Sequence, residues 1–377
     1  MLEKTAVVCY VIDRCLSITP KDLICLEISG ELTIMCNMAA YAGRKAAAPI
    51  LFRMLESQEA LGGGHYNGIA TIHEGKIHMI KCIGSTAELL RRYPEVLELP
   101  GTVGIAHSRT PGIDSDEWAQ PFFAHDEQVI YCANGAAGRF KDTDYNTAYE
   151  QDKADGIRYR TLIDKPAASY PVMNDGCCVH SSEVVANLLR RTQKEGKLLR
   201  RAMGEACFNL KSEIAALALA VAEPDTVSAI RINQPLMWGR KEDGFYLATS
   251  AFALENENIN WINPVPAASV MTMGRDKIEF EAHDTYMPWF AGSNPLSAVN
   301  AKLDEMLDSG KDFCVNDFCE AAAACWPEDK MAVANMVVYE YLREKSHSGL
   351  IESFVVDTPG SGAGLTAPQR RYRRPQA

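Results

Sequence analysis

Short strands joined by glycine turns are the feature of this sequence that most restricts its fold. Residues 65–74 and 76–82 flank Gly75, and residues 268–273 and 277–282 form a second pair of the same kind. Two strands separated by so short a turn predict a β-hairpin, whose strands run antiparallel. Further strands are predicted at 37–43, 102–108, 128–133, 214–222, 227–232 and 245–250. The chain is therefore expected to build antiparallel sheets.

Helical segments alternate with these strands. Residues 46–61 carry Leu51, Met54 and Leu55 at helical spacing and end at the three glycines of 62–64. A shorter helix is predicted at 86–92, and a helix pair at 181–191 and 198–208. Because helices and hairpins succeed each other in this way, we expect an α+β fold with helices layered outside antiparallel sheets.

The pattern changes beyond residue 285. Amphipathic helices are predicted at 296–307, 315–325 and 330–345, and a strand at 352–357. Residues 285–358 are therefore predicted to form a small helical module that resembles a docking or winged-helix-like domain. Residues 359–377 are rich in glycine, proline and arginine and are expected to be a disordered basic tail. The polar segment 141–160 is expected to be a solvated insertion.

Composition excludes several classes of protein. The 377 residues suffice for one or two domains, and the 47% apolar and 23% charged shares are those of a soluble globular protein. A net charge of −11 argues against nucleic acid or an anionic membrane surface as the main partner. No apolar run is long enough to span a bilayer. The twelve cysteines show neither a disulfide framework nor a zinc ribbon, so we expect a cytoplasmic protein with reduced thiols and with no metal or cofactor.

One cysteine, Cys36, directly follows a methionine and precedes a strand of small and apolar residues. If the chain begins at Cys36, or is cut before it, this residue carries a free α-amine beside its thiol, and hence a base beside a nucleophile. Residues 1–35 would then be an N-terminal extension or propeptide. The alternative for any single cysteine is a small side chain buried in the core.

Three other segments carry residues suited to amide chemistry. Arg109 follows a buried-looking strand and precedes a Pro-Gly turn, where a fixed guanidinium can bind a carboxylate with two hydrogen bonds. Asn134-Gly135 ends another strand and offers an amide N–H beside an unhindered backbone N–H, the two donors that an oxyanion needs. His65 lies in a tight loop that enters a strand. Taken singly, the arginine could lie on a loop rim and Asn-Gly could form an ordinary turn.

In this order, the segments resemble the class II glutamine amidotransferases, members of the N-terminal nucleophile hydrolase superfamily. The resemblance rests on the stretches around Cys36, 66–70, 104–109, 119–121 and 133–135, and on 234–239 and 246–250 further along. It covers about residues 35–282 and implies a four-layer αββα sandwich of antiparallel sheets over 36–284, followed by the small C-terminal module.

The resemblance also implies roles for individual residues. Cys36 would attack the side-chain amide of glutamine and form a glutamyl thioester, while its own α-amine acts as base. The Asn134 side chain and the Gly135 N–H would hold the oxyanion, and Arg109 would bind the substrate carboxylate. Further substrate-binding positions are Thr110, Ser181 and His65.

The chain departs from the family pattern at several positions. Asn37 stands where the family has glycine after the nucleophile, and Gln120 replaces the histidine of an Ala-His-Pro segment. Ser181 stands where an aspartate binds the substrate ammonium, and a neutral hydroxyl leaves that charge without a counterion. Either Asp175 or Glu183 compensates, or the substrate is not free glutamine.

Three functional hypotheses follow. The first is a glutamine amidotransferase domain that releases ammonia for a separate synthase chain. The second is an amide hydrolase of the same fold with another substrate, which is favoured by Ser181 and by Thr110-Pro111-Gly112, a segment shorter than the one the family has after the arginine. The third is a non-catalytic sensor or scaffold, which applies if residues 1–34 stay attached and block the Cys36 amine. The formation of a homo-oligomer stays open.

Overall fold

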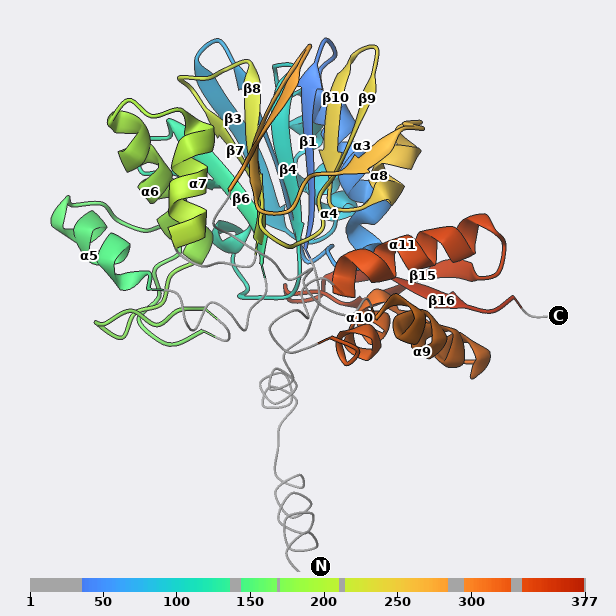
Figure 1. Ribbon diagram of the computed structural model, residues 1–377. Coiled ribbons are helices and arrows are strands. Elements are labelled where there is room, and N and C mark those ends of the chain that lie inside the picture. Colours follow the sequence, from blue (N-terminus) through green and yellow to red (C-terminus); the bar gives the residue numbers. More distant parts are fainter. Residues whose placement is uncertain are drawn as a thin grey trace, which may run out of the picture. The chain divides into compact units, whose positions relative to one another are not determined.

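The computed structural model describes residues 36–135, 144–167, 170–209, 214–283, 295–326 and 334–375. Two antiparallel sheets dominate these residues (Figure 1). In the described residues the first sheet has seven strands, in the order β11 (Ile262–Pro264), β9 (Met237–Lys241), β10 (Gly244–Ala248), β1 (Asn37–Gly43), β4 (Val103–Arg109), β2 (Tyr66–His73) and β3 (Lys76–Ile83). The second has six, in the order β13 (Ile278–Ala282), β12 (Ser269–Gly274), β8 (Thr226–Arg231), β7 (Ile214–Ala220), β6 (Val129–Gly135) and β5 (Phe122–Phe123).

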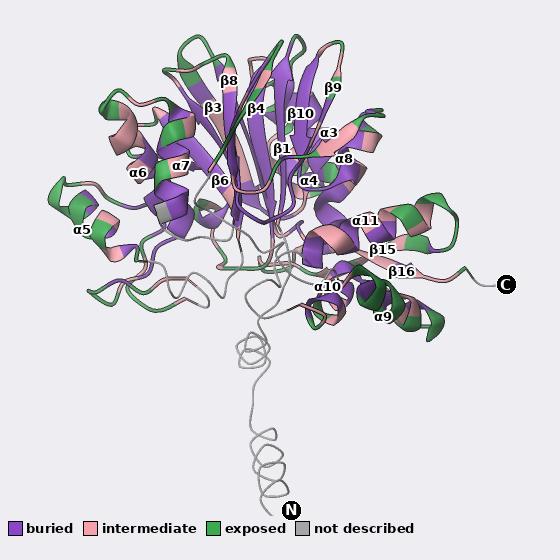
Figure 2. Ribbon diagram, in the orientation of Figure 1, coloured by how far each residue is buried: buried purple, intermediate pink, exposed green. Residues whose placement is uncertain are grey.

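The two sheets pack face to face. Alternate residues of each strand point into the space between them, so Met38 and Ala40 of β1 share one buried cluster with Ile130 of β6 and Leu217 of β7. These strands are buried along most of their length (Figure 2). The sandwich interior is therefore the main hydrophobic core.

Helices cover the outer face of each sheet. On the first sheet lie α3 (Ala47–Gln58), α4 (Thr86–Arg92) and α8 (Ala251–Asn256), with short 3-10 turns η2 (Glu59–Leu61), η3 (Pro94–Glu98) and η4 (Asp116–Trp118). On the second lie α6 (Ser181–Lys194) and α7 (Leu199–Asn209), as Figure 1 shows. The apolar stripe of α3 packs on the face of β1 that carries Ala39 and Tyr41. The predicted four-layer αββα arrangement of antiparallel sheets is confirmed.

The C-terminal module has a core of its own. Its elements are α9 (Leu296–Asp308), β14 (Phe313–Cys314), α10 (Val315–Ala323), α11 (Ala334–His347), β15 (Glu352–Pro359) and β16 (Thr366–Arg373). The strands form a three-stranded sheet in the order β14-β16-β15 within the described residues. Phe318, Leu303 and Tyr372 meet in its buried cluster. The division from the sandwich at residue 285 stays a prediction, because residues 284–294 lie outside the described part.

The prediction of a disordered tail from residue 359 is wrong for the residues that the structure describes. Thr366–Arg373 form β16, which pairs with β15 along eight positions. Two of the basic side chains pair with acids of the module: Arg373 with Glu352 and Arg371 with Asp312. Tyr372 of the same strand is buried, so it adds an apolar contact with the core of the module to these ion pairs.

The polar segment 141–160 also differs from its prediction as a solvated insertion. Its described residues contain helix α5 (Asn146–Ala154), whose Tyr149 is buried in the cluster beneath α6. Asp152 is buried as well and pairs with Arg191 of α6. Residues 1–35, predicted to be an N-terminal extension or propeptide, lie outside the described residues. In the parts of the chain that the structure describes, no helix has both the length and the apolar character that crossing a membrane requires.

Candidate active site

Cys36 lies directly before β1 and faces the segment that follows β4. Its Sγ atom is 3.5 Å from the hydroxyl oxygen of Thr110, and the Thr110 backbone N–H donates to the same sulfur at 3.5 Å. The Cys36 side chain is half-buried. By contrast, burial raises the pKa of the Cys82 and Cys207 thiols to about 12, which makes them poor nucleophiles. Cys36 is thus a thiol that a small substrate can reach.

The strand register places Cys36 and Arg109 at the same end of neighbouring strands. Strands β1 and β4 are antiparallel with Asn37 opposite Ser108, so the next position brings Cys36 opposite Arg109. Residues opposite each other on antiparallel strands carry their side chains on one face. The structure therefore brings together two of the residues that the sequence singled out.

Asn134, at the end of β6, reaches across from the second sheet. Its side-chain Nδ2 donates to the carbonyl oxygen of Cys36 at 2.6 Å and to the hydroxyl of Thr249 at 3.1 Å. Thr249 in turn accepts the backbone N–H of Met38 at 2.8 Å. Asn134 thus lies beside the candidate nucleophile, but both hydrogens of its amide are engaged. Gly135 is the last residue of β6, opposite Ile214.

Gln120 holds the strand end that carries Asn134. Its side-chain oxygen accepts the Ala133 N–H at 2.8 Å, and its side-chain nitrogen donates to the Ala133 carbonyl at 3.0 Å. The same nitrogen is 3.1 Å from Nε2 of His107. Burial lowers the pKa of His107 to about 3, so this imidazole is neutral at ordinary pH. From the sequence, Gln120 was only a departure from the family pattern, and its two hydrogen bonds with the Ala133 backbone were not predicted.

Arg109 is buried without a carboxylate partner among the residues that the structure describes. Only 2% of its surface is exposed; Nη1 donates to the Trp118 carbonyl at 3.0 Å, and Nη2 contacts the Tyr170 hydroxyl. The guanidinium lies over the ring of Tyr66, 4.7 Å from its centre. Burial lowers the pKa of Arg109, yet arginine remains protonated. Since a buried charge without a counterion is costly, the site is suited to an anion such as a carboxylate.

The turn after Arg109 passes close to this guanidinium at Gly112. A Cβ atom at Gly112 would lie 2.7 Å from Nη2 of Arg109. The turn after Arg109 therefore presses directly onto the charged group, and it also carries Thr110, which contacts Cys36. This one turn connects the two ends of the candidate site.

His65 borders the Arg109 end of the site. Its backbone N–H donates to the Arg109 carbonyl at 3.1 Å, and its Nδ1 is 3.2 Å from the hydroxyl of Ser361. Burial and the charge of Arg109 lower the pKa of His65 to about 4. The imidazole is therefore neutral and can accept a hydrogen bond through one nitrogen.

Ser181 is the first residue of α6 and is buried, with 4% of its surface exposed. The preceding residue, His180, packs its ring on Trp118 and Tyr170, so this helix end reaches the surroundings of Arg109. The two acids expected to compensate for Ser181 are engaged elsewhere. Glu183 accepts hydrogen bonds from the Arg160 and Thr161 backbone and from the Thr161 hydroxyl.

Asp175, the second of these acids, pairs with Lys153 at 2.7 Å and accepts a hydrogen bond from Tyr149 at 3.0 Å. These contacts hold the pKa of Asp175 well below its usual range. Compensation of the missing aspartate by Asp175 or Glu183 is therefore not supported.

Among the described residues, no cluster of histidine, cysteine and acidic side chains is arranged to hold a metal ion.

Curated relatives of this chain use glutamine. The chain is 29% identical over 224 residues to glutamine–fructose-6-phosphate aminotransferase (isomerizing) of Clostridium acetobutylicum, a match that covers 59% of this chain and 33% of the relative. The corresponding protein of Rhizobium leguminosarum bv. viciae is 29% identical over 235 residues, which are 61% of this chain and 34% of the relative. The chain thus spans about a third of the length of these relatives. No protein-family model matches it.

Two solved structures share the fold. The allosteric regulatory enzyme of purine biosynthesis superposes with a TM-score of 0.52 and 16% identity, covering 66% of this chain and 48% of that one. Glutamine phosphoribosylpyrophosphate amidotransferase from B. subtilis superposes with a TM-score of 0.52 and 15% identity, covering 82% and 64%. The fold of this chain is thus shared with these two enzymes. The chain is thus similar in sequence to glutamine-named aminotransferases and shares its fold with an amidotransferase, which supports the resemblance to class II glutamine amidotransferases.

Proposed function

We propose that this chain hydrolyses the side-chain amide of glutamine, with Cys36 as the nucleophile. The observation that carries the proposal is the pairing of a half-buried thiol with a buried guanidinium that lacks a carboxylate partner among the described residues. Because Cys36, directly before β1, lies opposite Arg109 at the end of β4, one small molecule can occupy both. A substrate carboxylate bound at Arg109 would place its side-chain amide toward the sulfur.

The proposed reaction needs a free α-amine at Cys36. The thiol proton passes to this amine, the sulfur bonds to the δ-carbon of glutamine, and the carbon–nitrogen bond breaks. The leaving nitrogen takes the proton and departs as ammonia. Water then adds to the thioester, the sulfur–carbon bond breaks, and glutamate and the thiol are restored. An α-amine with a pKa near 8 is suited to both proton transfers at neutral pH.

Asn134 and Gly135 are the proposed oxyanion donors. Asn134 donates to the Cys36 carbonyl and to Thr249 in the structure, so we propose that it exchanges one of these bonds for the oxyanion during attack. Loss of such a donor typically lowers turnover by about 10²–10³-fold. Thr110, through its contact with the sulfur, and His65, beside Arg109, are proposed to shape the pocket.

The acceptor of the ammonia is proposed to be a separate synthase chain. The curated relatives are named for amino transfer to fructose-6-phosphate, and this chain matches about a third of their length. We propose that this chain supplies the ammonia-releasing half of such a reaction and that another chain supplies the acceptor site.

A second substrate class is favoured because Glu183 and Asp175 already bind other groups of the protein and so do not offer a counterion to a substrate ammonium. With Ser181 at the position of the family aspartate, the site is suited to an amide that has a free carboxylate but no α-ammonium group. Glutaramate, which is glutamine without its amino group, tests this directly. A kcat/KM for glutaramate above that for glutamine would favour the second class, and the reverse would favour glutamine.

The test is glutamate release by a chain that starts at Cys36, with Cys36→Ala and Cys177→Ala as matched variants. Both cysteines are half-buried, so the pair separates nucleophilic attack from the general loss of a thiol. We expect release by the wild type and by Cys177→Ala, and none by Cys36→Ala. Release by Cys36→Ala, or none by the wild type from either amide, would exclude the proposal and favour a non-catalytic scaffold. The intact mass of the native protein shows in addition which residue comes first.

A further inference from the structure

The loop between β15 and β16 reaches the candidate active site from the C-terminal module. The Ser361 hydroxyl in this loop accepts the Gly112 backbone N–H at 3.2 Å and lies 3.2 Å from Nδ1 of His65. A hydroxyl can accept one bond and donate another at the same time. Because His65 is neutral, its ring nitrogen can accept the Ser361 proton while Ser361 accepts from Gly112. One side chain thus bridges two segments that border Arg109.

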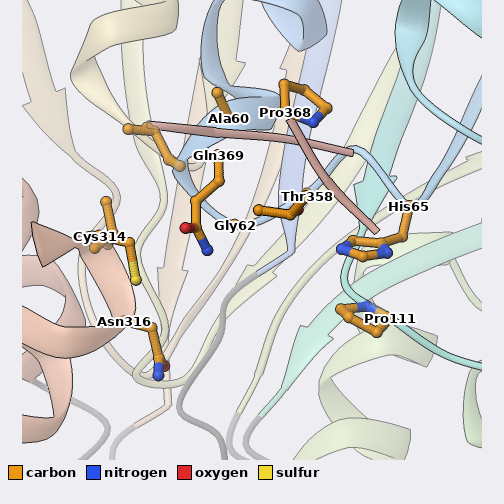
Figure 3. A pocket seen from close by; sticks show the side chains of 12 residues that line it. Ala60, Gly62, His65, Pro111, Cys314, Asn316, Thr358, Pro368 and Gln369 are labelled. Carbon is orange, nitrogen blue, oxygen red and sulfur yellow. The ribbon is translucent and has the colours of Figure 1, made fainter. Parts of the chain in front are cut away.

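The rest of the hairpin fits closely against the same segments. A Cβ atom at Gly64 would lie 2.7 Å from Cδ of Pro368, so the backbone beside His65 lies directly against β16. Leu365 packs in the buried cluster that contains Tyr66 and Ile83. Side chains of both modules line one cavity of about 50 Å³. Figure 3 shows His65 and Pro111 of the sandwich and Thr358 and Pro368 of the hairpin among them. The hairpin is therefore seated against this end of the site along several contacts.

The turn that the hairpin contacts at Gly112 lies between Arg109 and Cys36, the two ends of the candidate site. Gly112 lies over the Arg109 guanidinium, and Thr110, two residues earlier, contacts the Cys36 sulfur. A displacement of Gly112 would therefore change both the covering of Arg109 and the position of Thr110. The Ser361 hydroxyl is the hydrogen-bonding partner that fixes the Gly112 backbone N–H.

We propose that Ser361 is a positioning residue of the amidotransferase site, through which the C-terminal hairpin sets the geometry of the turn over Arg109. This inference rests on the proposed function, because it takes Arg109 as the residue that binds the carboxylate of the substrate. It makes the C-terminal module a part of the substrate site, and Ser361 acts on the substrate through Gly112 and His65.

The test compares Ser361→Ala with Ser361→Thr, which keeps the hydroxyl, and with Ser353→Ala, an exposed serine of β15. In the chain that starts at Cys36, we expect Ser361→Ala to raise KM for the better of the two amides by about tenfold, the effect of losing one or two hydrogen bonds. The value of kcat is expected to change by less than about threefold, because the reacting atoms are untouched. Ser361→Thr is expected to restore KM, and Ser353→Ala to leave it unchanged.

Amide hydrogen exchange of residues 110–117 gives a readout that does not depend on activity. Loss of the Ser361 hydroxyl is expected to speed exchange at Gly112 by about tenfold, with no change in Ser353→Ala. Unchanged exchange in Ser361→Ala would overturn the proposal, and so would an unchanged KM in an active enzyme. If the wild type releases nothing from either amide, the proposed function fails, while the exchange result still decides whether Ser361 fixes this turn.

Discussion

The two ends of the candidate site are built in different ways. At the nucleophile end, Cys36, Asn134 and Thr249 are joined by hydrogen bonds, and Gln120 fixes the strand that carries Asn134. At the carboxylate end, Arg109 has a backbone carbonyl and a tyrosine hydroxyl as partners and no described carboxylate. The first end is held by the sheets, whereas the second is closed by turns and by a hairpin from another module. Their difference supports the proposal that the nucleophile end is preorganised and that the carboxylate end is completed by a ligand.

The largest expected effect is at Arg109. In Arg109→Gln, kcat/KM should fall by about 10²–10³-fold, because the substrate carboxylate loses its charged partner in a buried site. The free energy of unfolding should stay the same or rise, since the variant removes a buried charge that has no counterion. Kinetics and urea denaturation measure the two quantities.

A matched control for this variant is Arg91→Gln. Arg91 is exposed and pairs with Glu88 on the surface, so its loss should change neither quantity appreciably. A loss of stability in Arg109→Gln without a loss of activity would contradict the assignment of this end as a ligand site.

The second effect concerns pH. Burial lowers the pKa of His107 to about 3, while the unfolded residue titrates near its ordinary value of 6.5. The unfolded chain therefore binds a proton first, and the stability that is present above pH 6.5 is lost as the pH falls toward 3. The expected slope is about 1.4 kcal/mol per pH unit for this histidine.

The variant His107→Gln measures that contribution. Between pH 6.5 and 4.5 it should lose about 2 kcal/mol less than the wild type, as followed by denaturation at several pH values. His65, whose pKa is lowered to about 4, contributes in the same direction and serves as the comparison from the carboxylate end. Equal pH slopes in His107→Gln and the wild type would argue against a neutral, buried imidazole at the nucleophile end.

The smallest effect is expected at Gln120. In Gln120→Ala, the Ala133 N–H loses its side-chain partner and the Ala133 carbonyl keeps only the contact with His107 Nε2, so the free energy of unfolding should fall by about 2 kcal/mol. Turnover should fall with little change in KM, because the strand end with Asn134 shifts while Arg109 is unaffected. Urea denaturation and steady-state kinetics test both parts. A change in KM alone would place Gln120 at the substrate-binding end instead.

The nucleophile end could be predicted from the sequence because its residues lie at strand ends. Cys36 directly precedes a strand and Asn134 lies at the end of another, both with clear apolar patterns, and the face-to-face packing of the two sheets brings these strand ends together. The role of Gln120 could not be read in this way, since it precedes the two-residue strand β5 and acts on a residue from a different strand. Its partner is fixed only by the tertiary arrangement.

The carboxylate end was predicted less completely. The sequence indicated Arg109 and His65, but the glycines and arginines around Ser361 were interpreted as a disordered tail. That interpretation failed because β16 is stabilised by pairing with β15 and by acidic partners such as Glu352 and Asp312, which are distant in the sequence. Composition describes the charges of a segment and does not show which neighbours neutralise them.

The most direct test of the central claim is glutamate release by two forms of the same chain, one that starts at Cys36 and one that retains residues 1–35. In the second form the Cys36 nitrogen is an amide and has no basic lone pair, so the general base is absent. We expect the form that starts at Cys36 to release glutamate and ammonia in equal amounts, and the longer form to release at least about 10²-fold less. Equal activity of the two forms, or no activity in the form that starts at Cys36, would contradict the assignment of Cys36 as an N-terminal nucleophile.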